Sequence, residues 1–137
     1  MTGNPMLTVL IVDDEPSIAN GLAKLLARRG YSVAIAMNSL AATDILTTRR
    51  IDIVVIDYRI PDMRGDILYA KAAAIQPHLK TQTIFLTGDP SDEVQQVIRE
   101  TGCPSFLKPF DISELEDALR RIVRAIGGDT NQSINAA

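Results

Sequence analysis

The sequence of 137 residues predicts an α/β fold in which a five-stranded parallel sheet carries helices on both faces. Three observations predict it. Short apolar runs alternate with segments of helical periodicity along most of the chain. The runs are continuously apolar, as expected for strands buried on both faces. The connections are short, so consecutive strand–helix–strand units should be right-handed and lie in one sheet.

Five strands and five helices are expected in alternation. The strands are the β-rich segments 7–12, 31–36, 51–57, 83–88 and 105–107. The helices are the segments with apolar residues at helical spacing, namely 16–29, 40–50, 66–76, 92–102 and 112–126.

Turn and cap residues set the limits of the first two helices. Ile18, Leu22 and Leu26 recur at helical spacing in the first helix, and Gly30 is a natural stop after it. Ser39 is expected to cap the second helix, because its hydroxyl can accept a hydrogen bond from a free backbone N–H of the first turn.

The remaining helices carry similar signals. Pro77 ends the third helix, and Ser91 is placed to cap the fourth. Asp111 and Glu114 have the spacing of a capping box at the start of the last helix. One apolar stripe follows on that helix, formed by Ile112, Leu115, Leu119, Ile122, Val123 and Ile126.

Composition and charge exclude several functional classes. The chain is 46% hydrophobic and 23% charged, which is ordinary for a globular domain, and a net charge of -3 argues against direct nucleic-acid binding. No apolar run reaches the roughly 20 residues that span a bilayer, and no membrane association is expected. The N-terminal MTGNPM lacks the pattern of a signal peptide, and Cys103 has no partner for an internal disulfide. We therefore expect a cytoplasmic protein.

Polar residues follow four of the five strands. Asp13 and Asp14 end the first strand, Asp57 the third and Thr87 the fourth, while Lys108 follows the fifth. The carboxyl ends of parallel strands meet at one edge of the sheet, where ligands of such folds bind. Each residue alone has an ordinary explanation as a helix cap, a strand former or a solvated charge. Their coincidence at strand ends indicates a site.

Such a cluster of acids needs positive charge. Carboxylates a few Å apart raise one another's pKa or recruit a cation. Lys108 supplies one charge, and Mg²⁺ suits a site made of carboxylate oxygens. Softer metals are not expected, because the sequence has no set of Cys and His with ligand spacing.

Four ordered motifs resemble the receiver domains of two-component response regulators. They are LIVDDEP, VVIDYRIPDMRG, FLTG and FLKPFD, and the similarity extends over residues 7–126. It implies a flavodoxin-like, doubly wound sheet in strand order 2-1-3-4-5, with five helices and a cis Lys108–Pro109 peptide. Residues 1–6 are then a flexible N-terminus, and 127–137 a flexible tail or linker stub.

The resemblance also assigns roles. Asp57 would accept a phosphoryl group, and Asp13, Asp14, Asp57 and the backbone carbonyl of Arg59 would hold Mg²⁺. Thr87 would bond a phosphoryl oxygen, and Lys108 would pair with the phosphoryl charge.

The implied partners are a sensor histidine kinase or histidine phosphotransfer protein upstream, and a protein target or output domain downstream. A homodimer would also use the implied contact surface, which is the fourth helix, fifth strand and fifth helix. The protein would be a phosphoacceptor that promotes its own phosphorylation and dephosphorylation, not an enzyme acting on other substrates. The sequence leaves open whether the chain is complete or was cut from a longer regulator.

Two features depart from or vary within this family. An aromatic switch residue is usual three positions before the strand-5 lysine, but here that position is Ser105, and Phe106 should point to the opposite face of the sheet. Either the strand is shifted by one position or the coupling through an aromatic side chain is absent. Arg59 and Asp89, with Gly88, occupy variable positions that flank the phosphate. We expect Arg59 and Asp89 to pair across the mouth of the site and to restrict the water that would hydrolyse the acyl phosphate.

Two other functions remain open at this point. A degenerate receiver would bind a partner without phosphorylation, which the Ser105 departure permits. An Asp-dependent phosphatase would need a second acid two residues after its nucleophile, and here that residue is Arg59.

Overall fold

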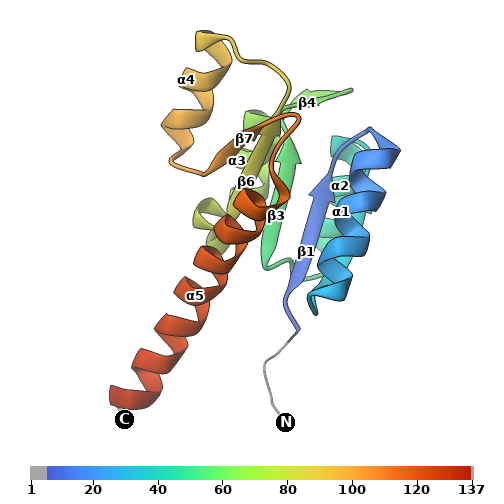
Figure 1. The fold of residues 1–137 in the computed structure, drawn as a ribbon. Coiled ribbons are helices and arrows are strands. Elements are labelled where there is room, and N and C mark those ends of the chain that lie inside the picture. The colour runs from blue at the N-terminus through green and yellow to red at the C-terminus, as the bar shows by residue number, and fades with distance from the viewer. Residues whose placement is uncertain (1–5, 137) are drawn as a thin grey trace.

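The computed structural model describes residues 6–136, with side chains through residue 127, and it contains a five-stranded parallel sheet (Figure 1). The strand order is β2-β1-β3-β6-β7, which is the predicted order 2-1-3-4-5 once two short strands outside the sheet are set aside. The sheet strands are β1 (Thr8–Val12), β2 (Ser32–Ala36), β3 (Ile53–Asp57), β6 (Thr83–Thr87) and β7 (Ser105–Leu107). The helices are α1 (Pro16–Arg28), α2 (Ser39–Thr48), α3 (Gly65–Ile75), α4 (Asp92–Thr101) and α5 (Ile112–Ala136). The predicted α/β fold is confirmed.

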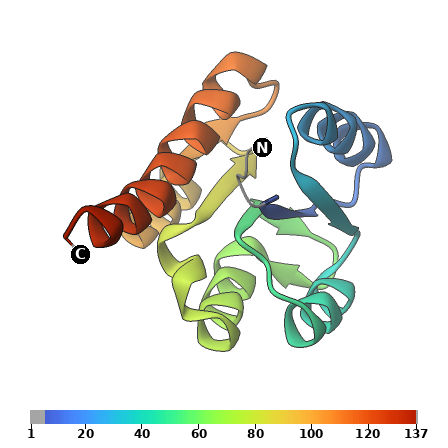
Figure 2. The ribbon, with the colours of Figure 1, turned by 90° about the horizontal axis from the view of Figure 1, so that it is seen from below.

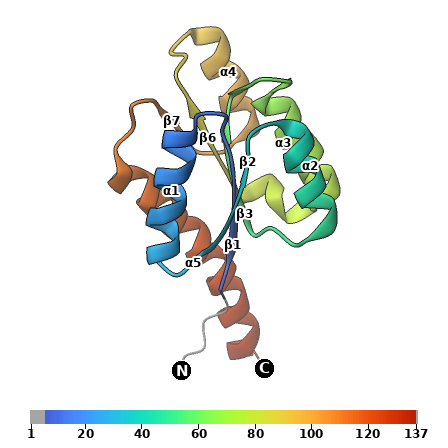
Figure 3. The same ribbon diagram turned by 90° about the vertical axis from the view of Figure 1, so that its right-hand side faces the viewer.

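The helices cover both faces of the sheet. Helices α1 and α5 lie on one face, and α2 and α3 on the other (Figures 2 and 3). Alternate residues of each central strand feed two separate hydrophobic clusters: in β1, Val9 and Ile11 pack toward α1 and α5, whereas Leu10 and Val12 pack toward α2 and α3. These four side chains are fully buried. Burial on both faces explains why the strands read as continuous apolar runs.

One predicted N-cap is wrong, and one predicted capping box is incomplete. The N-cap of α2 is Asn38, whose side-chain oxygen accepts a hydrogen bond from the Ala41 N–H at 2.8 Å. Ser39 is instead the first helical residue, and its hydroxyl donates to Asp62 Oδ2 at 2.7 Å. At α5, Asp111 accepts from the N–H and the hydroxyl of Ser113. Among the bonds of the described residues, the reciprocal capping-box bond from the Glu114 carboxylate is absent.

Two short elements were not predicted. The loop after Asp57 contains a hairpin of two-residue strands, β4 (Arg59–Ile60) and β5 (Met63–Arg64), and a 3₁₀ helix, η1 (Pro77–Thr81), precedes β6. Asp62, in the turn of the hairpin, also accepts a hydrogen bond from the Ser39 N–H at 2.9 Å. The hairpin is therefore tied to the first turn of α2.

The structure tests the predicted flexible ends of the receiver domain only in part. Helix α5 continues past Ile126, the last residue of the predicted helix, to Ala136. Residues 1–5 and the side chains after residue 127 lie outside the described part, so flexibility of the two ends stays a prediction. No helix in the described part of the chain is both long and apolar enough to cross a membrane.

Gly65 allows α3 to start in close contact with the backbone of Asp57 and Tyr58. Its N–H donates to the Tyr58 carbonyl at 2.7 Å. A Cβ at this position would lie 2.7 Å from Tyr58 Cα and 2.8 Å from the Asp57 carbonyl oxygen, both of which are backbone atoms. Any side chain at Gly65 would therefore displace the backbone that carries Asp57.

We expect Gly65→Ala to lower the free energy of unfolding by about 1 to 3 kcal/mol, the usual cost of overpacking. Gly21→Ala is the matched control, because Gly21 lies in α1 and has open space around it. That change should stabilise the protein by up to about 1 kcal/mol, since alanine is the better helix former. Urea denaturation of both variants measures the difference, and equal midpoints would contradict the close approach at Gly65.

Candidate functional site

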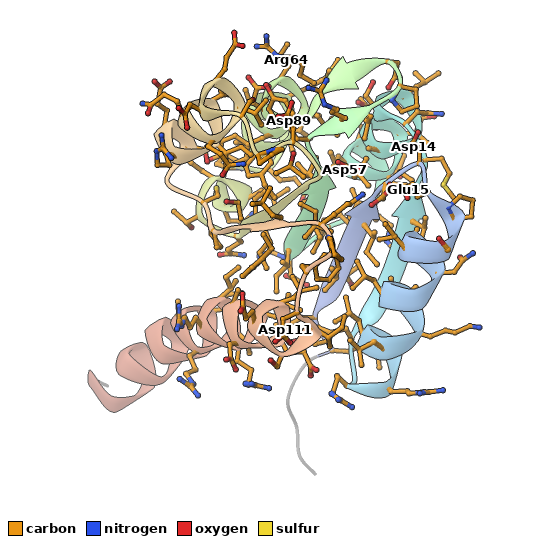
Figure 4. The ribbon with its side chains drawn as sticks, turned by 45° about the horizontal axis from the view of Figure 1, so that its top comes forward. Asp14, Glu15, Asp57, Arg64, Asp89 and Asp111 are labelled. Carbon is orange, nitrogen blue, oxygen red and sulfur yellow. The ribbon has the colours of Figure 1, made fainter. Side chains whose placement is uncertain are left out.

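The predicted site residues meet at the carboxyl edge of the sheet. Strand β1 pairs with β3, and β3 pairs with β6, so the ends of the three strands are neighbours. Asp57 and Asp14 lie together there in Figure 4, with Asp89 on the far side of the site. Asp13, Asp57 and Thr87 are buried, whereas Asp14 is exposed. The expected convergence of acids, hydroxyl and ammonium is therefore present in the fold.

Lys108 is the centre of this cluster. Its Nζ donates to Asp57 Oδ2 at 2.8 Å, to Asp13 Oδ2 at 3.0 Å and to Glu15 Oε1 at 3.1 Å. The three N–H groups of the ammonium thus have three carboxylate partners. A cis peptide joins Lys108 to Pro109, as the resemblance implied. The Lys108 N–H also donates to the Thr87 carbonyl at 2.7 Å, which fixes the lysine at the end of β6.

Backbone donors hold the other carboxylate oxygens. The Arg59 N–H donates to Asp57 Oδ1 at 3.1 Å, and the Glu15 N–H donates to Asp13 Oδ1 at 2.9 Å. Both buried acids are therefore oriented by one backbone bond and one bond from Lys108. Fixed carboxylates of this kind are preorganised for a ligand that arrives from the mouth of the site.

Burial and hydrogen bonding shift the pKa values of Asp57 and Lys108. Burial raises the pKa of Asp57 above its ordinary value, and the bonds from Lys108 and the Arg59 N–H reduce this rise without cancelling it. Burial alone would lower the pKa of Lys108, but hydrogen bonds to Asp57, Asp13 and Glu15 raise it above its ordinary value. Lys108 therefore stays charged at neutral pH, and Asp57 takes up a proton more readily than an exposed carboxyl group.

The acids fit a hard divalent cation. Oxygens of Asp13, Asp14 and Asp57 all lie within 4.8 Å of one another. Carboxylate oxygens are the ligands that Mg²⁺ prefers. Lys108 supplies one positive charge, whereas Glu15 and these three aspartates carry four negative charges. The role of the Arg59 backbone carbonyl as a ligand stays a prediction.

Thr87 is oriented by the loop that follows it. Its hydroxyl accepts a hydrogen bond from the Asp89 N–H at 3.0 Å, and its side chain is 1% exposed. The hydroxyl hydrogen has no acceptor among the described residues, so it can be donated to an oxygen of a ligand at the site. Gly88, next in the chain, is exposed and has open space around it.

Arg59 and Asp89 pair, as expected from their positions. The Arg59 guanidinium donates to Asp89 Oδ2, and the pair joins the loop after β3 to the loop after β6. Asp89 Oδ1 also accepts from the Ser91 N–H at 2.9 Å. That bond and the one from Arg59 lower the pKa of Asp89 to about 2, so the ion pair persists at neutral pH.

The family of this chain follows from its likeness to known proteins. Residues 9–120 match the family described as response regulator receiver domain. The chain belongs to this family.

Several relatives resemble this receiver domain over most of its length. It is 34% identical over 114 residues to sporulation initiation phosphotransferase F of Bacillus subtilis (strain 168), covering 82% of this chain and 90% of that protein. It is 33% identical over 133 residues to the probable transcriptional regulatory protein TcrX of Mycobacterium tuberculosis, covering 96% of this chain. The chain spans 55% of TcrX and about half the length of several other transcriptional regulators that it matches.

Solved structures agree on the fold. The chemotaxis protein CheY4 of Vibrio cholerae superposes with a TM-score of 0.76 at 28% identity, covering 86% of this chain and 99% of that one. The signal receiver domain of an HD domain-containing protein from Pseudomonas fluorescens Pf-5 superposes with a TM-score of 0.79 at 30% identity, covering 88% and 97%. The solved structures and the family match therefore agree that this chain has the receiver fold.

Strand β7 of this receiver domain carries its aromatic side chain on the face opposite to that of the usual switch residue. Ser105 pairs with Phe85, and Phe106 with Leu86, in a register without slippage. Phe106 packs against the cluster between the sheet and helices α1 and α5. Leu107, opposite Thr87, is 46% exposed. The face of β7 next to Thr87 therefore holds Ser105 and Leu107.

Sequence reasoning missed two contributors to the site. Glu15 was read only as part of a motif, yet it is the third partner of Lys108. Asp62 was not singled out, yet it ties the loop after Asp57 to α2. Both contacts join residues far apart in the sequence, and the only available signal was that both residues are acids inside matched motifs.

Removal of the ammonium should destabilise the receiver domain in a way that depends on pH. We expect Lys108→Met to lower the free energy of unfolding near neutral pH, without divalent cations, by about 1 to 3 kcal/mol, because Asp13 and Asp57 lose a charged partner. Without Lys108 the pKa of Asp57, which burial already raises, rises further above its unfolded value. The loss should therefore be largest above this pKa and shrink as the pH falls through it.

Urea denaturation of Lys108→Met at about pH 7 and about pH 5, in EDTA and in MgCl₂, measures this effect. Lys24→Met is the control, because Lys24 is an exposed residue of α1. Added Mg²⁺ should restore part of the lost stability in Lys108→Met. A loss independent of both pH and Mg²⁺ would show that the buried acids do not depend on Lys108.

Proposed function

We propose that this receiver domain accepts a phosphoryl group on Asp57 from the phosphohistidine of a sensor histidine kinase or a histidine phosphotransfer protein, in the cytoplasm and with Mg²⁺. The observation that carries the proposal is the position of Asp57. It is a buried carboxylate held by Lys108 and the Arg59 N–H, with Asp13 and Asp14 beside it. Sporulation initiation phosphotransferase F is, by its name, a protein of phosphoryl transfer.

The reaction is a displacement at phosphorus. An oxygen of Asp57 forms the new bond to phosphorus while the bond from phosphorus to the donor imidazole nitrogen breaks. The electron pair of that bond stays on the imidazole. Positioning and charge neutralisation supply most of the catalysis in such reactions. Lys108 then exchanges its bond to Asp57 for one to a phosphoryl oxygen, and the Thr87 hydroxyl donates its hydrogen to another.

Mg²⁺ would be held by the carboxylates of Asp13, Asp14 and Asp57 and by the backbone carbonyl of Arg59. When bound, a divalent cation neutralises charge on the phosphoryl oxygens and on the attacking carboxylate. The chain's own part is to keep two buried acids fixed through the Glu15 and Arg59 N–H groups.

The output would pass through α4, β7 and α5. Thr87 and Gly88 begin the loop that leads into α4, and Thr87 bonds the N–H of Asp89 in that loop. A shift of Thr87 toward a phosphoryl oxygen would move this loop and so bias a two-state equilibrium of α4. The surface that changes would bind a downstream protein target, an output domain or a second copy of the chain.

A degenerate receiver that binds its partner without phosphorylation is the second candidate. One observation favours it: no aromatic side chain lies beside Thr87 on β7, because Phe106 packs on the opposite face. Phosphorylation of Asp57 separates the two candidates.

Incubation with a small phosphodonor such as acetyl phosphate should add one phosphoryl group to the wild-type chain, read by intact mass, in MgCl₂ but not in EDTA. Asp57→Asn should gain none, and Asp44→Asn, a change at an exposed acid of α2, should behave as wild type. Failure of the wild type would favour the degenerate receiver. A gain that persists in Asp57→Asn would overturn the assignment of the acceptor.

The ion pair between Arg59 and Asp89 should lengthen the lifetime of the phosphoryl group, because it limits the approach of water across the mouth of the site. We expect Arg59→Ala to shorten the half-life of the phosphorylated chain several-fold, measured by the decay of the phosphorylated mass. Arg64→Ala is the matched control: Arg64 lies in the same hairpin, is similarly exposed and pairs with Asp66 on its own side of the site. If Arg59→Ala left the half-life unchanged, the pair would have no such role.

A further inference from the structure

Glu15 stands at the N-cap of α1 without capping it. Its backbone is extended, with φ −93° and ψ 105°, and its side chain makes no cap hydrogen bond to the helix. Glutamate is not among the residues preferred at this position, where Asp, Asn, Ser or Thr would satisfy a free N–H. The first turn of α1 therefore gains no hydrogen bond from the Glu15 carboxylate.

That carboxylate contacts Lys108 instead. Glu15 Oε1 accepts from Lys108 Nζ at 3.1 Å, across 93 positions of sequence. The backbone N–H of the same residue donates to Asp13 Oδ1 at 2.9 Å. Glu15 is thus bonded to two members of the site, and it is labelled beside Asp14 at the mouth in Figure 4.

The three partners of Lys108 are not equivalent. Asp13 and Asp57 are buried and belong to the trio of acids whose oxygens lie within 4.8 Å of one another. Glu15 is outside that trio, and its side chain is 54% exposed. A divalent cation held by Asp13 and Asp57 would draw on two of the carboxylates that also bind the ammonium. Glu15 is the one partner that such a cation leaves to Lys108.

We propose that Glu15 is a positioning residue that retains the Lys108 ammonium at the mouth of the site while a divalent cation takes up Asp13 and Asp57. Without Glu15, the ammonium would bind only Asp13 and Asp57, so the cation and the ammonium would compete for the same two carboxylates. With Glu15, the ammonium keeps one carboxylate and stays within reach of an incoming phosphoryl oxygen. This inference rests on the proposed function and adds to it a residue outside the cation-binding set.

Two substitutions distinguish the contact between Glu15 and Lys108 from the negative charge of Glu15. Glu15→Asp keeps the negative charge and introduces a good N-cap residue, but its side chain is one methylene shorter and falls short of Lys108. Glu15→Gln loses the charge and keeps the length. The measurement is a MgCl₂ titration followed by the amide NMR shifts of Asp13, Asp57 and Tyr58, which needs no phosphodonor.

We expect the Mg²⁺ concentration at half-saturation to rise several-fold in Glu15→Asp and further in Glu15→Gln. The thermal midpoint of Glu15→Asp in EDTA should be equal to or above that of wild type, because the new cap stabilises α1. A weaker affinity without a loss of stability distinguishes positioning from a structural defect. If Glu15→Asp bound Mg²⁺ like wild type and only Glu15→Gln were weaker, the effect would be one of charge alone and the proposal would fail.

A double-mutant cycle tests the route through Lys108. In a Lys108→Met background, Glu15→Asp should leave the Mg²⁺ affinity unchanged, because the contact it shortens no longer exists. An undiminished effect in that background would overturn the proposal. Failure of the wild type itself to bind Mg²⁺ or to gain a phosphoryl group would instead overturn the proposed function, so the two failures are distinguishable.

Discussion

The structure of the site depends on one ammonium group placed among acids at the end of a parallel sheet. Two of the carboxylates that Lys108 contacts are buried, and an isolated buried charge is costly. Lys108 makes that burial tolerable, and its three bonds help to orient Asp13, Asp57 and Glu15. Because one positive charge does not balance them, the edge keeps a residual negative field that attracts a further cation.

The sheet brings these groups together by its topology. Residues of β1 and β3 pair side by side, and β6 lies next to β3, so acids that are 44 positions apart in sequence become neighbours. Lys108 follows the edge strand β7, and its backbone N–H bonds the last carbonyl of β6. Gly65 allows α3 to start against the backbone of Asp57 and Tyr58. Packing and site geometry therefore depend on the same few strand ends.

Much of this was predictable, because the strands and the strand-end acids are local signals. Continuous β-branched runs identify buried strands, and strand alternation places Phe106 away from Thr87. The rest depends on contacts between distant segments. Asn38 and Ser39 are both good caps by local preference, and Asp62, 23 positions away, engages the Ser39 hydroxyl. The β4–β5 hairpin is too short to have a periodicity, and the direction of the Glu15 side chain depends on Lys108.

The loop after Asp57 is tied on two sides by bonds of unequal strength. Asp62 accepts bonds from the N–H and the buried hydroxyl of Ser39, and these bonds lower its pKa, so the tie to α2 persists at neutral pH. On the other side the tie is one exposed ion pair between Arg59 and Asp89, of a kind that contributes little to stability. A displacement that begins at Asp57 should therefore meet less resistance on the side of α4 than on the side of α2. The asymmetry gives the domain a direction of response, toward α4 and away from α2, before any partner is bound.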